Sequence, residues 1–258
     1  MALDNLVKMG VIRVSELELA LLRLVEHGPV VLDPTVPNWA LRRLVDTGRV
    51  LRLRRGVYLA PTPAGKLPPL PAVLGSFAAD GYISFAAALA HRGFTDQDPG
   101  RWVVVSPTRR APIRYGRLTV SFHLSSRKAT SASTVEELIN GVTVRYATAT
   151  QAFLDILGTP QLGPELGSLV GAFRAGVDGG RLDLEEFRRD LLMTGSLVMA
   201  RRGGLLIELA CGITDNELLV RARRSHNWSA VTSSRGERDS RWYVVLPDSR
   251  ARILARAS

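Results

Sequence analysis

The fold of the amino-terminal region is decided by residues 35–61, which run TVPNWALRRLVDTGRVLRLRRGVYLAP. Leu41, Leu44 and Val45 recur at the spacing of one helical face, which predicts a short amphipathic helix. Gly48 follows where such a helix should end, because glycine adopts the left-handed conformation at little steric cost. Apolar and basic residues then alternate as far as a basic turn with a second glycine, and β-forming residues follow it. The stretch therefore predicts a helix and then a tight two-stranded hairpin.

A further helix is predicted before this stretch. Ser15 and Glu18 have the spacing of a capping box, in which each side chain satisfies a free backbone amide at the helix start. Residues 30–32, Val-Val-Leu, suit either a short strand or the first turn of another helix, since three residues show no periodicity. The helix that follows them has two candidate caps, Thr35 and Asn38. Helix, helix and basic hairpin in this order predict a winged helix-turn-helix.

Arginine dominates the charge of this region. Residues 39–60 contain six arginines and one acid, Asp46, within a chain of formal net charge +10. A guanidinium is a bidentate partner for phosphate oxygens and for the edge of guanine, so double-stranded DNA is the expected partner, with the helix in the major groove. The alternative to DNA binding is a basic surface that only contacts solvent. Trp39 has two interpretations, since its ring is expected either to pack against the DNA or to lie in the core of the small domain. The expected DNA contacts are Asn38, Trp39, Arg42, Arg43, Arg49, Arg52, Arg54 and Arg55.

Length and composition set the wider frame. A chain of 258 residues exceeds the usual single domain, which predicts two, at 1–66 and 67–258. The sequence pI near 10.7 favours a polyanionic partner. Cys211 is the one cysteine, so neither an internal disulfide nor a cysteine metal cluster is expected. The first ten residues lack a secretion signal and no apolar run has membrane-spanning length, so the expected protein is soluble and cytoplasmic.

The remainder of the chain mixes strand and helix patterns. Prolines crowd residues 61–71, which are expected to form a linker, and an Ala-rich helix capped by Ser84 should follow. Helical patterns dominate from about residue 148, although Gly203–Gly204 is expected to interrupt one of them, and a final strand is expected near 242–247. The predicted class is α+β, with a winged helix-turn-helix before a larger mixed α/β domain whose carboxyl-terminal part is helical. Earlier strands are expected at 102–107, 118–124 and 142–147, and later helices at 165–177, 182–193 and 197–210.

Three blocks of this sequence resemble AbiEi-type antitoxins. They are LVDTGRVLRLRRGVYLAP at 44–61, YISFAAALAHRGFTDQ at 82–97 and VRYATATQAFLDIL at 144–157, in the order of that family. The first block is similar to the winged-helix module at the head of the family. One position departs from the pattern, because many relatives carry Glu where this chain has Gln151.

The resemblance implies a transcriptional autorepressor of a toxin–antitoxin operon. Its amino-terminal module would bind inverted repeats in its own promoter, as a monomer in solution that binds cooperatively on DNA. Its carboxyl-terminal domain would counter a nucleotidyltransferase-like toxin encoded alongside, with or without direct contact. A plain regulator without a toxin partner is the alternative within the same class.

No set of residues in the sequence predicts an enzyme, a cofactor or a metal site. The four histidines are far apart, the Gly-rich pieces lack the Lys-Ser/Thr of a phosphate loop, and no serine lies in a Gly-x-Ser-x-Gly elbow. The enzyme alternative is a metal-dependent nuclease that would use Asp80, Asp96, Asp98 and Asp155, which requires these carboxylates to converge. Three arginine groups are open to a partner protein or to DNA, and they lie at 109–110, 201–202 and 221–224.

Overall fold

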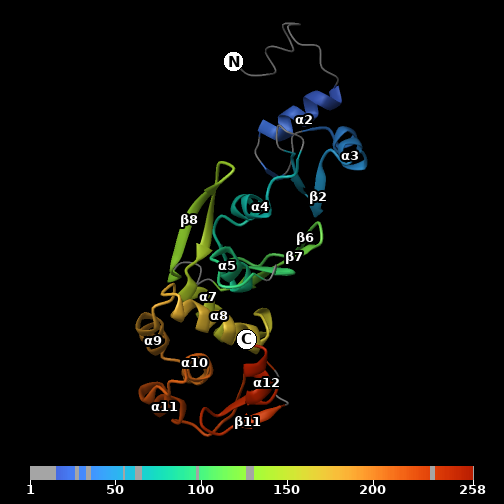
Figure 1. Cartoon of the computed structure of the whole chain (residues 1–258). Helices are drawn as coiled ribbons and strands as arrows, with labels where there is room; N and C mark the ends of the chain where they lie inside the picture. Colours follow the sequence, from blue (N-terminus) through green and yellow to red (C-terminus); the bar gives the residue numbers. More distant parts are fainter. Residues whose placement is uncertain are drawn as a thin grey trace. The chain divides into compact units, whose positions relative to one another are not determined.

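The structure is a computed structural model that describes residues 16–26, 29–32, 36–54, 56–61, 66–96, 99–125, 131–232 and 236–257 (Figure 1). It belongs to the mixed α+β class, as predicted. The chain packs as two units, the first comprising residues 1–79, 111–119 and 136–144 and the second comprising 80–110, 120–135 and 145–258. These bounds differ from the expected domains of 1–66 and 67–258. Within the described ranges, no helix combines the length and the apolar character that crossing a membrane requires.

The first unit combines short helices with a small sheet. The three-stranded sheet has the order β1-β3-β2 and is antiparallel throughout. The stretch that could have been strand or helix is therefore strand β1. The elements are α2 (Glu16–Glu26), β1 (Val30–Leu32), α3 (Asn38–Asp46), β2 (Leu51–Arg54), β3 (Val57–Leu59), α4 (Leu70–Phe77) and β6 (Ile113–Tyr115).

Apolar residues at helical spacing build the core of this unit. Leu41 and Leu44 of α3 are buried and Val45 packs beside them, as the periodicity predicts. Leu24 of α2 is buried against the same cluster. The predicted cap of α2, Ser15, lies outside the described residues.

Gly48 ends α3 as expected and sets the direction of the hairpin. Its φ of +70° lies in the left-handed region. The amide of Gly48 donates to the carbonyl of Val45 (3.0 Å), and the amide of Arg49 donates to the carbonyl of Leu44 (2.9 Å). These two bonds form a Schellman motif. The chain therefore leaves the helix in a fixed direction and enters β2 two residues later.

The predicted linker is partly helical. Helix α4 begins at Leu70, with Pro69 as its N-cap and Pro71 in its first turn. Proline is tolerated there because the first amides of a helix have no partner within the helix. The expectation that residues 61–71 form a linker is therefore wrong for residues 70 and 71, which are the first two residues of α4.

The second unit builds its core on the middle of a mixed sheet. The strand order is β6-β7-β5-β4-β9-β8, with β4 antiparallel to β5 and parallel to β9. Some residues of this sheet, at 113–119 and 136–144, belong to the first unit, and the others belong to the second. The elements are β4 (Tyr82–Ser84), α5 (Phe85–His91), β5 (Arg101–Ser106), β7 (Leu118–Leu124), β8 (Thr134–Ile139), β9 (Val142–Ala147), α7 (Ala149–Gly158), η1 (Pro160–Leu162), α8 (Leu166–Asp178), α9 (Leu184–Met193) and α10 (Leu197–Cys211).

Aromatic rings hold the helices of this unit together. Phe153 of α7 lies edge-on to Phe94 (centroids 5.8 Å apart) and to Phe173 of α8 (5.1 Å). Phe173 in turn lies 4.9 Å from Phe187 of α9. Such edge-to-face pairs add to the burial of the rings. These four side chains are buried and join the helices to one core.

Helix α10 is continuous, which corrects the expected break at Gly203–Gly204. A Cβ on Gly203 would lie 2.4 Å from the side chain of Leu191, and one on Gly204 would lie 2.1 Å from the ring of Trp242. The two glycines therefore give close helix packing. They do not interrupt the helix.

The carboxyl-terminal part of the second unit adds a small sheet. The expected final strand near 242–247 is β12, which pairs in parallel with β10 and antiparallel with β11. A short helix follows it that the sequence analysis did not predict. These elements are α11 (Asn216–Ala222), β10 (Ser229–Ala230), β11 (Glu237–Asp239), β12 (Val244–Leu246) and α12 (Arg250–Ala255).

Candidate nucleic-acid interface

Helix α3 turns a polar and basic face to solvent. Its buried positions are Ala40, Leu41 and Leu44. The positions between them are exposed because a helix with 3.6 residues per turn separates them from the core face. The exposed side chains are Asn38, Trp39, Arg42 and Arg43.

Trp39 belongs to this exposed face. Its side chain is 54% exposed, so the core interpretation of Trp39 is wrong. Tryptophan combines a large apolar ring with a polar N–H group, and it is enriched at interfaces.

The start of α3 differs from the prediction. Pro37 is the N-cap, and its carbonyl accepts the amide of Leu41 (3.0 Å). Asn38 is the first helical residue and makes no capping bond, while Thr35 lies outside the described residues. The amides of the first turn therefore have no side-chain partner. Such a helix end attracts anions.

The hairpin continues the basic surface. Arg52 and Arg54 alternate with half-buried leucines along β2 and are exposed on one side of it. The guanidinium of Arg54 lies 5.1 Å from the centroid of the Phe77 ring, so a cation–π contact holds it. Gly56 closes the turn at φ +73°. Arg55 lies outside the described residues.

Few acids oppose these cations. Arg42, Arg43, Arg49 and Arg52 form no ion pair with any other residue that the structure describes. Asp46, at the end of α3, is exposed. Among the described residues 36–54, Asp46 is the one acid beside five arginines.

Among the described residues, the carboxylates of the nuclease alternative form no group of three. Asp155 is fully buried, and its Oδ2 accepts hydrogen bonds from the hydroxyls of Ser84 (2.7 Å) and Tyr82 (3.0 Å). Asp80 pairs with Arg110 (2.7 Å). Asp98 lies outside the described residues, among which no three His, Cys, Asp or Glu side chains group as a metal ion requires.

Asp155 is instead the centre of a buried polar network. Its Oδ1 accepts the side-chain amide of Gln151 (2.9 Å). Burial first, and then the charge of Asp155, raise the pKa of the Tyr82 hydroxyl far above its usual value, so Tyr82 stays a donor. The predicted capping role of Ser84 is wrong, because its hydroxyl donates to Asp155 and does not cap α5. Thr148 does cap α7, as predicted, by accepting the amide of Gln151 (3.2 Å).

One of the three distal arginine groups faces inward. Arg201 is 1% exposed and donates to the carbonyl of Ala222 (2.9 Å), and Arg202 donates to the carbonyl of Leu157 (2.6 Å). Arg201–Arg202 is therefore not a surface patch. Arg223 and Arg224 of the predicted group at 221–224 are exposed, and they are followed by two exposed aromatic side chains, His226 and Trp228, which were not predicted.

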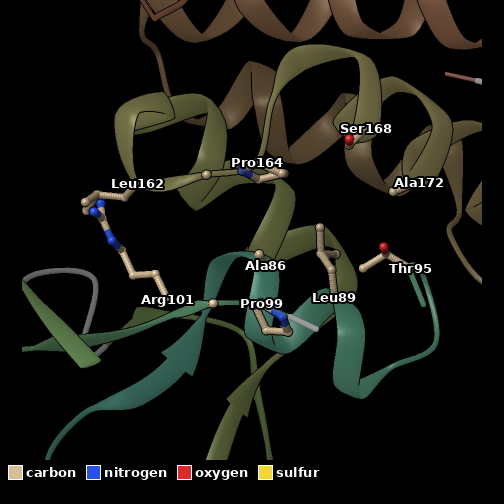
Figure 2. Close-up of a pocket in the computed structure, with 11 residues that line it drawn as sticks. Ala86, Leu89, Thr95, Pro99, Arg101, Leu162, Pro164, Ser168 and Ala172 are labelled. Atoms are coloured by element: carbon tan, nitrogen blue, oxygen red, sulfur yellow. The ribbon is translucent and has the colours of Figure 1, made fainter. Parts of the chain in front are cut away.

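A cavity of about 400 Å³ lies in the second unit (Figure 2). Figure 2 shows Arg101 and Leu162 at one end of it and Thr95 and Ser168 at the other. Most of its lining is apolar or glycine, and its described lining residues include no acid, histidine or cysteine. The cavity has the size of a small-ligand site but offers no general base among these residues.

Comparison with known proteins yields a fold but no family. No protein-family model matches the chain, and no curated protein matches it. Among solved structures, the chain is similar to the crystal structure of the RV2827C protein from Mycobacterium tuberculosis, with a TM-score of 0.66 and 16% sequence identity over 95% of each chain. The similarity extends over nearly the whole of both chains, so both units of this protein occur together in a solved structure.

Proposed function

We propose that this protein is a DNA-binding transcriptional autorepressor of the AbiEi antitoxin type, whose first unit is a winged helix-turn-helix. The observation that carries the proposal is the outward face of α3, where Asn38, Trp39, Arg42 and Arg43 are exposed beside an arginine-bearing hairpin. The strand between α2 and α3 pairs with the hairpin to complete a small sheet, which suits this motif.

In this proposal α3 lies in the major groove of duplex DNA. Its uncapped first turn faces a phosphate, which would accept hydrogen bonds from the free amides near Asn38. Arg42 and Arg43 bind phosphate oxygens or the O6/N7 edge of guanine. Trp39 packs against sugar or a thymine methyl group.

The hairpin is the wing of the same module. Arg52 and Arg54 lie on its exposed side, and Arg49 follows the turn at the end of α3. These side chains contact the sugar–phosphate backbone or the minor groove. Backbone contacts fix the register of the protein on DNA, whereas α3 reads the sequence.

The same proposal gives the second unit a role in countering a nucleotidyltransferase-like toxin. Its support is the resemblance of the three sequence blocks, two of which lie largely in this unit. A nucleotidyltransferase-like product of the neighbouring gene, retained by the full chain in a pull-down, is the expected result. An unrelated neighbouring gene would favour a plain regulator.

The DNA claim is tested with the full chain and a duplex that carries the promoter of its own gene. Arg42→Ala/Arg43→Ala should weaken binding by roughly 10-fold or more, since a good bidentate base contact is worth about 1–3 kcal/mol. The matched control is Arg189→Ala/Arg252→Ala, which removes the same charge from exposed positions of the second unit. Equal binding by both double variants, in a gel shift at one salt concentration, would contradict the proposal.

A further inference from the structure

The second unit exposes a cluster of aromatic rings near its carboxyl-terminal end. Trp228 is 37% exposed, and its ring centroid lies 5.5 Å from that of Tyr243. His226 is exposed and lies edge-on to Tyr243 at 5.6 Å. The three rings therefore form one surface, which we name the aromatic platform.

A buried arginine supports the platform from below. Arg201 donates to three backbone carbonyls of residues 222–227 and to the hydroxyl of Ser229 (3.0 Å). These bonds fix the segment that carries His226 and Trp228. The guanidinium of Arg201 also lies 5.5 Å from the Tyr243 ring. The platform is thus held in place before any ligand arrives.

The backbone at Tyr243 is held in an unfavourable conformation. Its φ is +53°, which a non-glycine residue rarely adopts. Asp239 stabilises the turn before it by accepting the amides of Arg241 and Trp242 (both 3.0 Å). Trp242 is buried in the core, whereas the next ring, Tyr243, is half-buried at the platform. Outliers of this kind gather at binding sites because the surrounding structure must maintain them.

Arginines surround the rings. The guanidinium of Arg238 lies 5.2 Å from the Trp228 ring. Arg223 and Arg224 are exposed at the end of α11, and Arg223 donates to the carbonyl of Arg241 (3.4 Å), next to the platform turn. Neither Arg224 nor Arg238 forms an ion pair with another described residue. The cations at this surface are available to an anionic ligand.

Charge and geometry select the ligand. The described residues of 221–243 include five arginines and two acids, Glu237 and Asp239, and the second of these pairs with Arg250. Guanidinium groups already lie against Trp228 and Tyr243, so a cationic ligand would be repelled. A ligand that carries both flat rings and negative charge fits, and duplex DNA does not, because its base faces are already stacked.

We propose that the aromatic platform binds unpaired nucleotides of a single-stranded nucleic acid. Bases stack on Trp228 and Tyr243, while Arg223, Arg224 and Arg238 contact the flanking phosphates. This site is separate from the duplex-binding face of α3 and does not depend on it. Single-stranded RNA and single-stranded DNA share the required chemistry, and the experiment below compares them.

The test measures fluorescence anisotropy of labelled mixed-sequence 12-mers with the full chain. The background is Arg42→Ala/Arg43→Ala, which removes the two exposed arginines of α3. In that background Trp228→Ala should weaken single-strand binding by roughly 5- to 150-fold, the range for losing one stacked base. Trp228→Phe should retain most of the affinity. Met193→Ala, which removes an exposed apolar side chain from α9, is the matched control and should leave single-strand affinity unchanged.

Several results decide the matter. If RNA binds more tightly than DNA, the site is assigned to single-stranded RNA, and if DNA binds more tightly, it is assigned to single-stranded DNA. Equal affinity assigns the site to single strands of both kinds. Single-strand affinity that is unaffected by Trp228→Ala, in a variant whose circular dichroism is unchanged, overturns the proposal. Displacement of the labelled oligonucleotide by polyglutamate as readily as by an unlabelled 12-mer of equal charge would also overturn it, because the surface would then recognise charge alone. Promoter duplex binding by Trp228→Ala on the parent background should be unchanged, which separates this proposal from the function of α3.

Discussion

The Asp155 network predicts the effect of placing an acid at position 151. In this chain the Gln151 amide donates to Asp155 at 2.9 Å, and its own oxygen accepts the amide of Ser133 (3.3 Å). Gln151→Glu would replace the donor with a carboxylate oxygen at the same distance. The hydrogen bonds that Asp155 accepts from the hydroxyls of Tyr82 and Ser84 would stay in place.

The magnitude follows from two terms. A hydrogen bond to a charged group contributes roughly 1.5–3 kcal/mol, and it is lost. Two unit charges 4 Å apart repel by roughly 4 kcal/mol at an effective dielectric constant of 20. Gln151 is half-buried, so the new side chain can rotate toward solvent and avoid much of this repulsion. We therefore expect a net loss of about 2–3 kcal/mol in the free energy of unfolding at neutral pH.

The loss should depend on pH. The neighbouring carboxylate raises the folded-state pKa of the introduced carboxyl, since it disfavours a second negative charge. Its protonated form can donate to Asp155, so stability is retained at low pH and is lost as the pH rises through that folded pKa. The deficit relative to the parent should shrink below about pH 5.

Urea unfolding at about pH 7.5 and about pH 5, followed by tryptophan fluorescence, measures both effects. The control is Gln151→Met, which removes the hydrogen bond without adding charge and should show a smaller, pH-independent loss. If Gln151→Glu is as stable as the parent at pH 7.5, or if its deficit is the same at both pH values, the arrangement inferred around Asp155 is wrong.

Three further changes test other parts of the fold. Gly48→Ala should cost about 1–2 kcal/mol in urea unfolding, because no atom lies within 4 Å of the new Cβ and only the left-handed backbone opposes it. Gly204→Ala should destabilise by roughly 1–3 kcal/mol, and by more than Gly203→Ala, since its Cβ meets the rigid ring of buried Trp242 whereas the other meets the flexible end of a leucine. Burial opposes ionisation of Glu208, but hydrogen bonds and charges from two arginines and Trp242 outweigh it and lower its pKa, so that this stabilisation is present above about pH 4.5 and is lost as the pH falls further. The melting temperature of the parent should therefore fall more steeply than that of Glu208→Gln between about pH 6 and pH 3.5.

Local patterns predicted the buried face of α3 and the point where it ends. The face of α3 follows from Leu41 and Leu44 alone, and Gly48 marks its end because only glycine takes that conformation cheaply. The exposure of Arg42 and Arg43 follows from the same periodicity. Each of these features depends on residues that are close together in the chain, which is why local sequence patterns predict it.

Features that depend on distant partners were missed or misassigned. Ser84 has the local signature of a helix cap, but Asp155, 71 residues away, accepts its hydroxyl. Gly204 suggests a helix break until Trp242 is seen to fill the space beside it. Arg201 looks like a surface cation until the segment after Ala222 folds over it. The aromatic platform had a sequence signal, aromatic residues interleaved with arginines, but its members are brought together only by the final sheet.

The central claim is that arginines on α3 contact phosphates or bases of duplex DNA, and its most direct test is the salt dependence of promoter affinity. The logarithm of the binding constant should fall linearly with the logarithm of salt concentration, with a slope near −0.9 for each neutralised phosphate. For Arg42→Ala/Arg43→Ala in the full chain, the account predicts a slope shallower by about one to two units than that of the parent or of Arg189→Ala/Arg252→Ala. A double variant with the slope of the parent would contradict the account, because α3 would then make no such contact with DNA.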